Sequence, residues 1–99
     1  LISVIMPNYK STNLEKSIKS VLNQTYKNVE LILVDGDSGK KTIQILKKYN
    51  NKIDFWLSEK DKGMWDAWNK GLKLARGRFV GIVDSTNNLY PDAMKILSN

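Results

Sequence analysis

The sequence predicts an α/β fold: a mostly parallel sheet with helices on both faces. Four short apolar runs recur along the 99 residues, and amphipathic segments with helical spacing separate them. This alternation of strand and helix favours right-handed crossovers onto a parallel sheet. The length suits one domain. We therefore predict a single α/β domain over residues 1–99, with its first strand in a central position.

The four apolar runs are predicted as strands that are buried on both faces. They are rich in Ile, Val, Leu and aromatic residues and are nearly continuous, which is typical of strands in a parallel sheet. The predicted strands cover residues 1–6, 29–34, 53–58 and 78–83.

The first two intervals between these strands have helical spacing. In the interval 11–24 the apolar residues share one face, and Thr12 and Glu15 have the spacing of a capping box. In the interval 40–50 the apolar residues again share a face, with lysines on the other side. The two apolar faces consist of Leu14, Ile18, Val21 and Leu22 in the first helix, and of Ile43, Leu46 and Tyr49 in the second.

A third helix is predicted over residues 63–77, with Gly77 as its C-terminal cap. A last helix is predicted from Pro91, because proline suits the first helical position and Asp92 then lies in the favourable first turn. The apolar stripe of the third helix is formed by Met64, Ala67, Trp68, Gly71, Leu74 and Ala75.

Composition excludes several kinds of chemistry. The chain has no cysteine and no histidine, so disulfides, thiolate metal sites and histidine-based catalysis are excluded. The net charge of +6 suits an anionic membrane surface, a polyanion or a phosphorylated ligand, but a solvated lysine-rich surface is the better explanation of most of these charges. Because the lysines are spread over several predicted helices, we do not expect nucleic-acid binding. No apolar run approaches the roughly 20 residues of a membrane span, and the first residues lack a signal-peptide pattern, which predicts a cytoplasmic protein.

Polar segments follow all four predicted strands, where ligands bind in open α/β sheets. They read PNYK, DGDSGK, EKDKG and DSTNN. Any one acidic residue here could simply cap a helix N-terminus, but their convergence on one edge indicates a site. The carboxylates in these segments are Asp35, Asp37, Glu59, Asp61 and Asp84.

The kind of site follows from what is missing and what is present. Neither the GxGxxG fingerprint nor a P-loop occurs. Tyr9 can stack on a planar base, and Asp35 can accept hydrogen bonds from a base or from ribose hydroxyls. Lys62 precedes the third helix and can meet a phosphate together with that helix N-terminus. These residues predict a nucleotide site without a P-loop.

Several stretches taken together resemble a known family. They are SVIMPNYK, SIKSVLNQTYKNVELILVDGDS, SEKDKGMWDAWNKGLKLARGRFVGIVDS and LYPDAM. In this order the chain resembles the N-terminal, nucleotide-sugar-binding half of the family 2 glycosyltransferases, which have the Rossmann-like GT-A fold. The segment DKGMWDAWNKG is similar to the family's DKGIYDAMNKG.

The resemblance implies a role for each matching position. The turn from Pro7 to Tyr9 would pack on the nucleobase, usually uracil, and Asp35 would lie beside the base and ribose. The chain departs from many relatives at Gly36, where they have a second Asp. The remaining donor-site positions that the resemblance implies are Asp61, Lys62, Gly63, Asp66, Asn69 and Asp84. Trp65 and Trp68 fit the core better than the site.

The resemblance also implies a divalent cation, Mg²⁺ or Mn²⁺, shared between a DxD motif and the donor diphosphate. Here Asp84 matches that motif, but Thr86 and Asn87 replace the expected acids. Neutral oxygens hold a hard cation more weakly than carboxylates do. We therefore expect a weakened or lost metal site, with Asp84 as its one charged ligand.

The implied function is the inverting transfer of a sugar from a nucleotide-diphosphate donor, usually UDP-linked, to an acceptor hydroxyl in bacterial polysaccharide biosynthesis. The acceptor would be a glycan or a lipid-linked saccharide, which allows a peripheral position at the inner face of the membrane. The catalytic base lies in the C-terminal half of the family domain, so this chain alone is expected to be inactive. The alternative is a non-catalytic α/β module that binds nucleotides or partners. Apolar surface left exposed by a truncated sheet would favour a homo-oligomer.

Overall fold

A computed structural model describes residues 1–25, 27–60, 63–83 and 85 of the chain. Strands and helices alternate in the predicted order, and the predicted last helix from Pro91 lies outside the described residues. The elements are β1 (Ile2–Asn8), α1 (Leu14–Leu22), β2 (Val29–Asp35), α2 (Lys40–Lys48), β3 (Phe55–Ser58), α3 (Met64–Leu74) and β4 (Phe79–Ile82).

The described strands form one parallel sheet in the order β3-β2-β1-β4. The predicted parallel sheet with a central first strand is thus confirmed. In the register of this sheet Asn8 lies opposite Asp35, and Asp35 lies opposite Ser58. The carboxyl ends of β1, β2 and β3 therefore form one row of polar residues at one edge.

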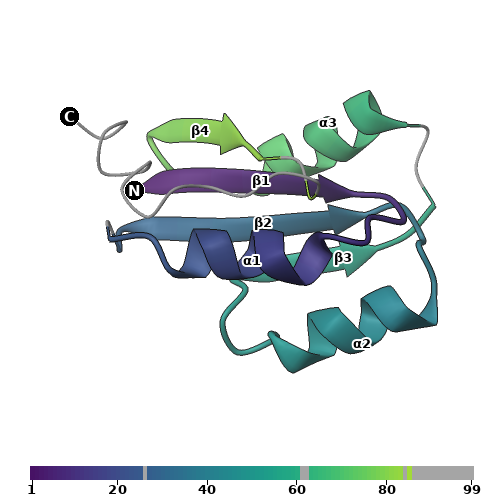
Figure 1. Cartoon of the computed structure of the whole chain (residues 1–99). Coiled ribbons are helices and arrows are strands. Elements are labelled where there is room, and N and C mark those ends of the chain that lie inside the picture. Colours follow the sequence, from purple (N-terminus) through teal and green to yellow (C-terminus); the bar gives the residue numbers. More distant parts are fainter. Residues whose placement is uncertain (26, 61–62, 84, 86–99) are drawn as a thin grey trace.

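Helices cover both faces of the sheet, with α1 and α2 on one side and α3 on the other (Figure 1). Alternate residues of β1 and β2 face the two layers, because successive side chains of a strand point to opposite faces. The larger core joins Val4, Met6, Leu31 and Leu33 to Leu14, Ile18 and Val21 of α1 and to Leu46 of α2. The smaller core joins Ile32 and Val34 to Ala67 of α3.

The sequence predicts that all strands are buried on both faces. The outer strands β3 and β4 are instead partly exposed. β4 pairs with β1 along Ile2–Ile5, and its side chains Phe79, Val80 and Ile82 are exposed. This apolar edge is the surface on which the expected homo-oligomer would depend, and that expectation stays a prediction. Among the described residues, no helix is both long enough and apolar enough to cross a membrane.

The predicted capping box of the first helix is wrong. α1 begins at Leu14 with Asn13 as its N-cap, so Glu15 is the second helical residue and lies one position too early for a capping box. Its carboxylate instead accepts hydrogen bonds from Lys48 at 2.8 Å and from the Tyr49 hydroxyl at 2.6 Å. Glu15 therefore ties α1 to the end of α2.

The predicted role of Gly77 as a helix cap is also wrong. α3 ends at Leu74, and the backbone becomes extended at Ala75. Gly77 lies against β1 and donates a backbone hydrogen bond to Ser3 Oγ at 2.7 Å. A Cβ at this position would overlap that oxygen and the Ser3 backbone. Glycine is needed here because two backbones approach closely.

Candidate functional site

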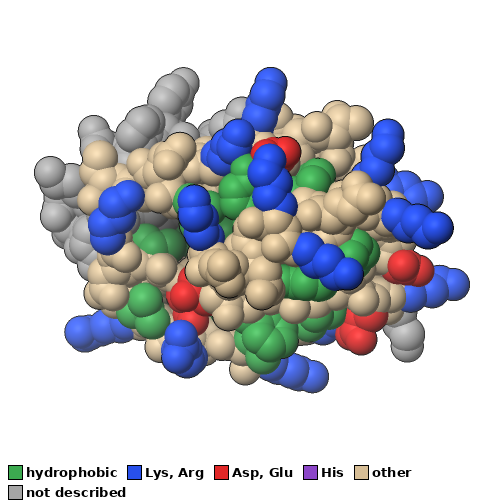
Figure 2. Space-filling model, turned by 90° about the horizontal axis from the view of Figure 1, so that it is seen from below, with side chains coloured by type: hydrophobic (Ala, Val, Ile, Leu, Met, Phe, Trp, Pro, Cys, Tyr) green, Lys and Arg blue, Asp and Glu red, His purple; other side chains and the backbone are tan. Residues whose placement is uncertain are grey.

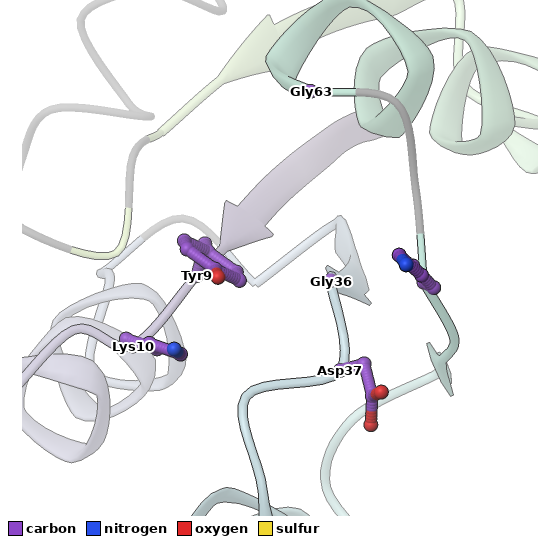
Figure 3. Close-up of a pocket in the computed structure, with 6 residues that line it drawn as sticks. Tyr9, Lys10, Gly36, Asp37 and Gly63 are labelled. Carbon is purple, nitrogen blue, oxygen red and sulfur yellow. The ribbon is translucent and has the colours of Figure 1, made fainter.

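A cavity of about 340 Å³ opens at the carboxyl edge of the sheet, where the sequence predicts a site (Figure 3). Its walls come from the loops that follow β1, β2 and β3 and from the start of α3. The lining residues are Tyr9, Lys10, Gly36, Asp37, Lys60 and Gly63. The cavity thus combines one aromatic ring, two lysines, one carboxylate and two glycines.

Tyr9 provides an open aromatic face to the cavity. Its side chain is 65% exposed, although tyrosine usually buries much of its ring. The Lys10 ammonium lies 5.1 Å from the centre of the ring, within the range of a cation–π contact. The Lys10 backbone N–H donates to Ser38 Oγ at 2.8 Å, which fixes the loop against the segment that follows β2. The exposed ring is therefore accessible for stacking on a planar ligand.

Asp35 lies beside this cavity but is not among its lining residues. Its side chain is completely buried. Oδ1 accepts hydrogen bonds from Asn8 Nδ2 at 2.8 Å and from Ser38 Oγ at 2.6 Å. Oδ2 accepts from Ser58 Oγ at 2.7 Å and from the Ser38 backbone N–H at 3.1 Å. The carboxylate thus links the ends of β1, β2 and β3, and both of its oxygens are used within the protein.

Among the residues described, Asp37 is the carboxylate that lines the cavity, and its carboxyl group points away from Tyr9 (Figure 3). It is exposed, and its φ of 63° lies in the left-handed region. Asp tolerates this region better than most residues with a side chain, because its short polar group can bond locally. Asp37 also lines a neighbouring cavity of about 490 Å³, which Gly39 and Lys40 at the start of α2 border as well. Asp37 therefore separates the two cavities.

The sequence predicts a site at the strand ends but indicates Asp35, and not Asp37, as the ligand at the end of β2. Lys10, Gly36 and Lys60 were also missed as lining residues, whereas Gly63, which the resemblance implies, does line the cavity. The available signal was positional: Asp35 continues an apolar strand, whereas Asp37 follows Gly36 and lies beyond the last paired residue. A residue beyond the end of a strand is free to face the edge of the sheet.

The predicted positions on α3 are not on the cavity wall. Asp66 is half-buried and Asn69 is exposed. Lys70, one turn after Asp66, lies 2.9 Å from Glu59 and 3.5 Å from Asp66. The hydrogen bond to Glu59 and the charge of Asp66 raise the pKa of Lys70. This part of α3 is thus occupied by an ion-pair cluster.

The other predicted site residues divide into two groups. Pro7 is buried within β1, one residue before the strand ends, so the loop begins two residues later than the resemblance implied. Asp61, Lys62 and Asp84 lie outside the described residues, as do Thr86 and Asn87. Gly63 opens α3 with a φ of 113°, a conformation that glycine adopts without strain.

The donor set at the predicted metal loop does not match a carboxylate-rich cation site. Within the described part of the chain, no group of three or more acidic residues is placed to hold a metal ion. In the segment 84–88, Asp84 is the one carboxylate. The Ser85 carbonyl oxygen already accepts hydrogen bonds from Ser17 Oγ at 2.7 Å and from Ser11 Oγ at 3.1 Å. We therefore assign no chemical step to a metal.

Comparison with known proteins identifies the family. The sequence profile of Glycosyl transferase family 2 matches residues 3–97, nearly the whole chain. The chain belongs to this family. The family predicted from sequence motifs is therefore confirmed, together with its GT-A fold.

Two relatives are named for related activities. One is UDP-Glc:alpha-D-GlcNAc-diphosphoundecaprenol beta-1,3-glucosyltransferase WfgD of Escherichia coli, 41% identical over 87 residues. That match covers 86% of this chain and 34% of the relative. The other is GalNAc(5)-diNAcBac-PP-undecaprenol beta-1,3-glucosyltransferase of Campylobacter jejuni, 36% identical over 101 residues, covering 97% of this chain and 33% of the relative.

A similar solved structure is that of S. aureus TarS 1-349 in complex with UDP-GlcNAc. It has a TM-score of 0.85 and 31% sequence identity, and the match covers 98% of this chain and 30% of the TarS chain. The family 2 chain described here thus spans about a third of the length of the proteins it matches.

Proposed function

We propose that this chain is the N-terminal, nucleotide-sugar-binding part of a GT-A glycosyltransferase domain. The whole protein would transfer a sugar from a UDP-linked donor to an acceptor hydroxyl with inversion. The observation that carries the proposal is the cavity at the carboxyl edge of the sheet, with an open aromatic ring, two lysines and an exposed carboxylate. The complex of the similar TarS structure with UDP-GlcNAc supports a donor of this class.

Each wall of the cavity suits one part of such a donor. The face of Tyr9 would stack on the uracil ring, since aromatic side chains pack well on flat rings. The Asp37 carboxylate would accept hydrogen bonds from ribose hydroxyls or from the uracil N–H. Lys10 and Lys60 would offset the charge of the diphosphate, assisted by the N-terminus of α3 at Gly63.

The predicted residues outside this wall keep a proposed place in the site. Asp61, Lys62 and Asp84 follow β3 and β4 in the sequence, next to segments that end at the same edge. Asp35 would act from beside the cavity by accepting hydrogen bonds from Asn8 and Ser38. Ser38 in turn accepts a hydrogen bond from the backbone of the loop that bears Tyr9, so Asp35 would hold this loop indirectly. In this arrangement Asp35 is a positioning residue rather than a ligand.

The acceptor and the location of the protein are proposed from its relatives. The names of two of them specify acceptors that carry undecaprenol through a diphosphate. We accordingly expect a glycan or a lipid-linked saccharide as acceptor, and a cytoplasmic protein that lies peripherally at the inner face of the membrane. The chain alone is expected to bind the donor without transferring the sugar, because the family's catalytic base belongs to the other half of the domain.

The test is a titration of the chain with UDP, followed by the backbone amide shifts of an NMR spectrum. The proposal expects shifts at Tyr9, Lys10, Gly36, Asp37 and Gly63. Tyr9→Ala should weaken binding at least about tenfold, the scale of one lost stacked aromatic contact. Phe79→Ala is the matched control, since Phe79 is an aromatic residue of β4 with 58% exposure and does not line the cavity. Shifts confined to the opposite edge of the sheet would reject this site.

The non-catalytic module remains the second candidate, because the segment 84–88 holds one carboxylate where the family resemblance implies more. Both candidates expect UDP to bind. They differ in the behaviour of the parent protein. Given a UDP-sugar and an acceptor, a transferase should release UDP as the sugar moves to the acceptor hydroxyl, whereas a module should leave the UDP-sugar intact.

A further inference from the structure

The two faces of the sheet carry very different charge. We define the basic layer as α1, α2 and the turns that follow these helices. Its exposed lysines are Lys16, Lys19, Lys27, Lys40, Lys41, Lys47, Lys48 and Lys52. Its acidic residues are Glu15, which lies 2.8 Å from Lys48 and 3.7 Å from Lys19, and Asp54, which accepts a hydrogen bond from the Leu31 backbone N–H. Most of these lysines are therefore not neutralised by acidic residues of the same layer.

The opposite layer, formed by α3 and the segment after it, is nearly balanced. Lys70 pairs with Glu59 and Asp66, and Arg76 lies 3.1 Å from the buried Glu30. In the described part of this layer, Lys73 and Arg78 are the cations without a recorded ion pair. The net charge of +6 thus resides mainly on the side of α1 and α2.

The lysines of the basic layer are spread over a broad surface and are not gathered in a narrow groove. Seen from the side on which α2 lies in Figure 1, Lys and Arg side chains project around the whole face, with few acidic groups among them (Figure 2). Lys19, Lys48 and Lys52 also border a hollow of about 430 Å³ between the two helices. Cations spread over two neighbouring helices suit an extended anionic surface better than a single bound anion.

We propose that the basic layer docks on a bilayer of anionic phospholipid. The choice of a bilayer rests on the proposed function, in which one of the two expected acceptors is a lipid-linked saccharide held in a membrane. A cluster of four to eight lysines at an anionic leaflet is the pattern expected for such binding, and each lysine near the surface changes partitioning by about fivefold. The eight exposed lysines of the layer fall within that range.

The position of the layer also fits the donor site. Lys40 is the first residue of α2 and lies at the carboxyl edge of the sheet. It lines the neighbouring cavity of about 490 Å³, and Asp37 lines both this cavity and the proposed donor cavity. The basic layer therefore extends to the rim of the donor site. Docking through it would bring the donor close to an acceptor whose diphosphate lies at the membrane surface.

The experiment measures co-sedimentation of the chain with vesicles of phosphatidylglycerol mixed with phosphatidylcholine, and with vesicles of phosphatidylcholine alone. Binding should require the anionic lipid and should weaken steeply with added salt, because charges at a surface are screened within about a nanometre. Equal binding to both kinds of vesicle, or no binding at low salt, would overturn the proposal.

Two double variants remove the same charge from opposite layers. Lys41→Gln with Lys47→Gln in α2 should lower partitioning at least about tenfold. Lys73→Gln with Arg78→Gln should change it less than about twofold, since these residues lie on the other layer. Thermal unfolding of both variants confirms that they fold. An equal loss in the two variants would show that net charge, and not this surface, governs binding.

A competition arm separates the bilayer from other polyanions. Inorganic polyphosphate and a short DNA duplex are added to protein bound to anionic vesicles. Release by either polymer at charge concentrations below that of the lipid would overturn the proposal in favour of a soluble polyanion. The readout does not involve UDP, so vesicle binding without UDP binding would reject the proposed donor site and leave the docking surface standing.

Discussion

Asn8 and Asp35 lie opposite each other at the ends of β1 and β2, and Asn8 Nδ2 donates a 2.8 Å hydrogen bond to the buried Asp35 carboxylate. Ser38 and Ser58 complete the group, so one carboxylate joins the carboxyl ends of three strands. The edge of the sheet at which the candidate cavity opens is therefore held by a buried polar network and not by apolar packing alone.

Asp35→Asn should destabilise the protein by about 2–4 kcal/mol, because an amide cannot accept hydrogen bonds at its nitrogen and leaves buried donors unpaired. The free energy of unfolding in urea measures this change. Asp37→Asn is the matched control: the same chemical change at an exposed residue should alter stability by less than about 0.5 kcal/mol. Comparable losses in the two variants would show that the network around Asp35 contributes little.

The same pair of variants separates positioning from ligand contact. Asp37→Asn should weaken UDP binding by about 10-fold or more while the protein stays folded, because a carboxylate accepts stronger hydrogen bonds than a neutral amide. Calorimetric titration with UDP gives the dissociation constant. Unchanged affinity in this variant, with affinity lost in Tyr9→Ala, would remove Asp37 from the proposed site and leave the stacking role of Tyr9.

Gly71 lies where α3 packs on β1, and a Cβ at this position would overlap the Ile5 side chain. Gly71→Ala should therefore destabilise the fold by about 1–3 kcal/mol, despite the better helix propensity of alanine. The control is Gly81→Ala in β4, where a Cβ would meet nothing within 4 Å. Urea unfolding of both variants is the measurement. A more stable Gly71→Ala variant would show that α3 can shift away from the sheet at no cost.

The contact between Glu15 and the end of α2 predicts how stability depends on pH. The hydrogen bond from Lys48, followed by that from Tyr49, lowers the pKa of Glu15 from 4.5 to about 2. Because this pKa is lower in the folded protein, the ionised Glu15 stabilises the fold fully when the pH is above the ordinary carboxyl pKa of 4.5. This stabilisation is lost as the pH falls from about 4.5 towards 2. Glu15 in turn raises the pKa of Lys48 and of Tyr49, so their contribution is lost as the pH rises through those raised values.

Glu15→Gln should lower the melting temperature by a few degrees near neutral pH and by progressively less towards both extremes. Lys41→Gln in the same basic layer is the control. Its difference in melting temperature from wild type should not become smaller below pH 4.5. Melts followed by circular dichroism across the pH range measure both variants. A constant difference between wild type and Glu15→Gln below pH 4.5 would contradict the assigned pKa of Glu15.

Much of the fold follows from local pattern. Continuous apolar runs located β1 and β2 because both strands are buried between helical layers, and helical spacing located α1, α2 and α3. What local pattern could not supply was the partner of each polar residue. Glu15 was assigned to a capping box, but its partners are 33 and 34 residues away on another helix. Gly77 was assigned to a helix end, but its constraint comes from Ser3.

A cavity does open at the edge of the sheet where the sequence predicts a site, but several residues of its wall were not predicted. The rule that ligands bind beyond the carboxyl ends of parallel strands is topological, so it needs only the order of elements. Which of two neighbouring acidic residues lines the cavity depends on where the strand pairing stops. β1 continues to Asn8 and pairs there with Asp35, which buries Asp35 and leaves Asp37 on the surface.

The last prediction concerns the segment after β4. If the family resemblance is correct, Thr86 and Asn87 occupy positions of metal-binding acids, and Thr86→Asp with Asn87→Asp should create a carboxylate cluster with Asp84. Without metal the double variant should be less stable than wild type, because like charges repel. With Mn²⁺ at about 100 times its dissociation constant, binding to the folded state should restore about 2.7 kcal/mol.

Thermal melts of wild type and double variant, with and without Mn²⁺, measure this effect. Thr12→Asp with Asn51→Asp adds the same charge away from the segment and should gain no stability from Mn²⁺. The wild-type chain should respond little, since Asp84 is the one carboxylate between residues 84 and 88. A wild-type melting temperature that rises by several degrees with Mn²⁺ would show that one carboxylate and neutral oxygens suffice, and that the metal site is intact.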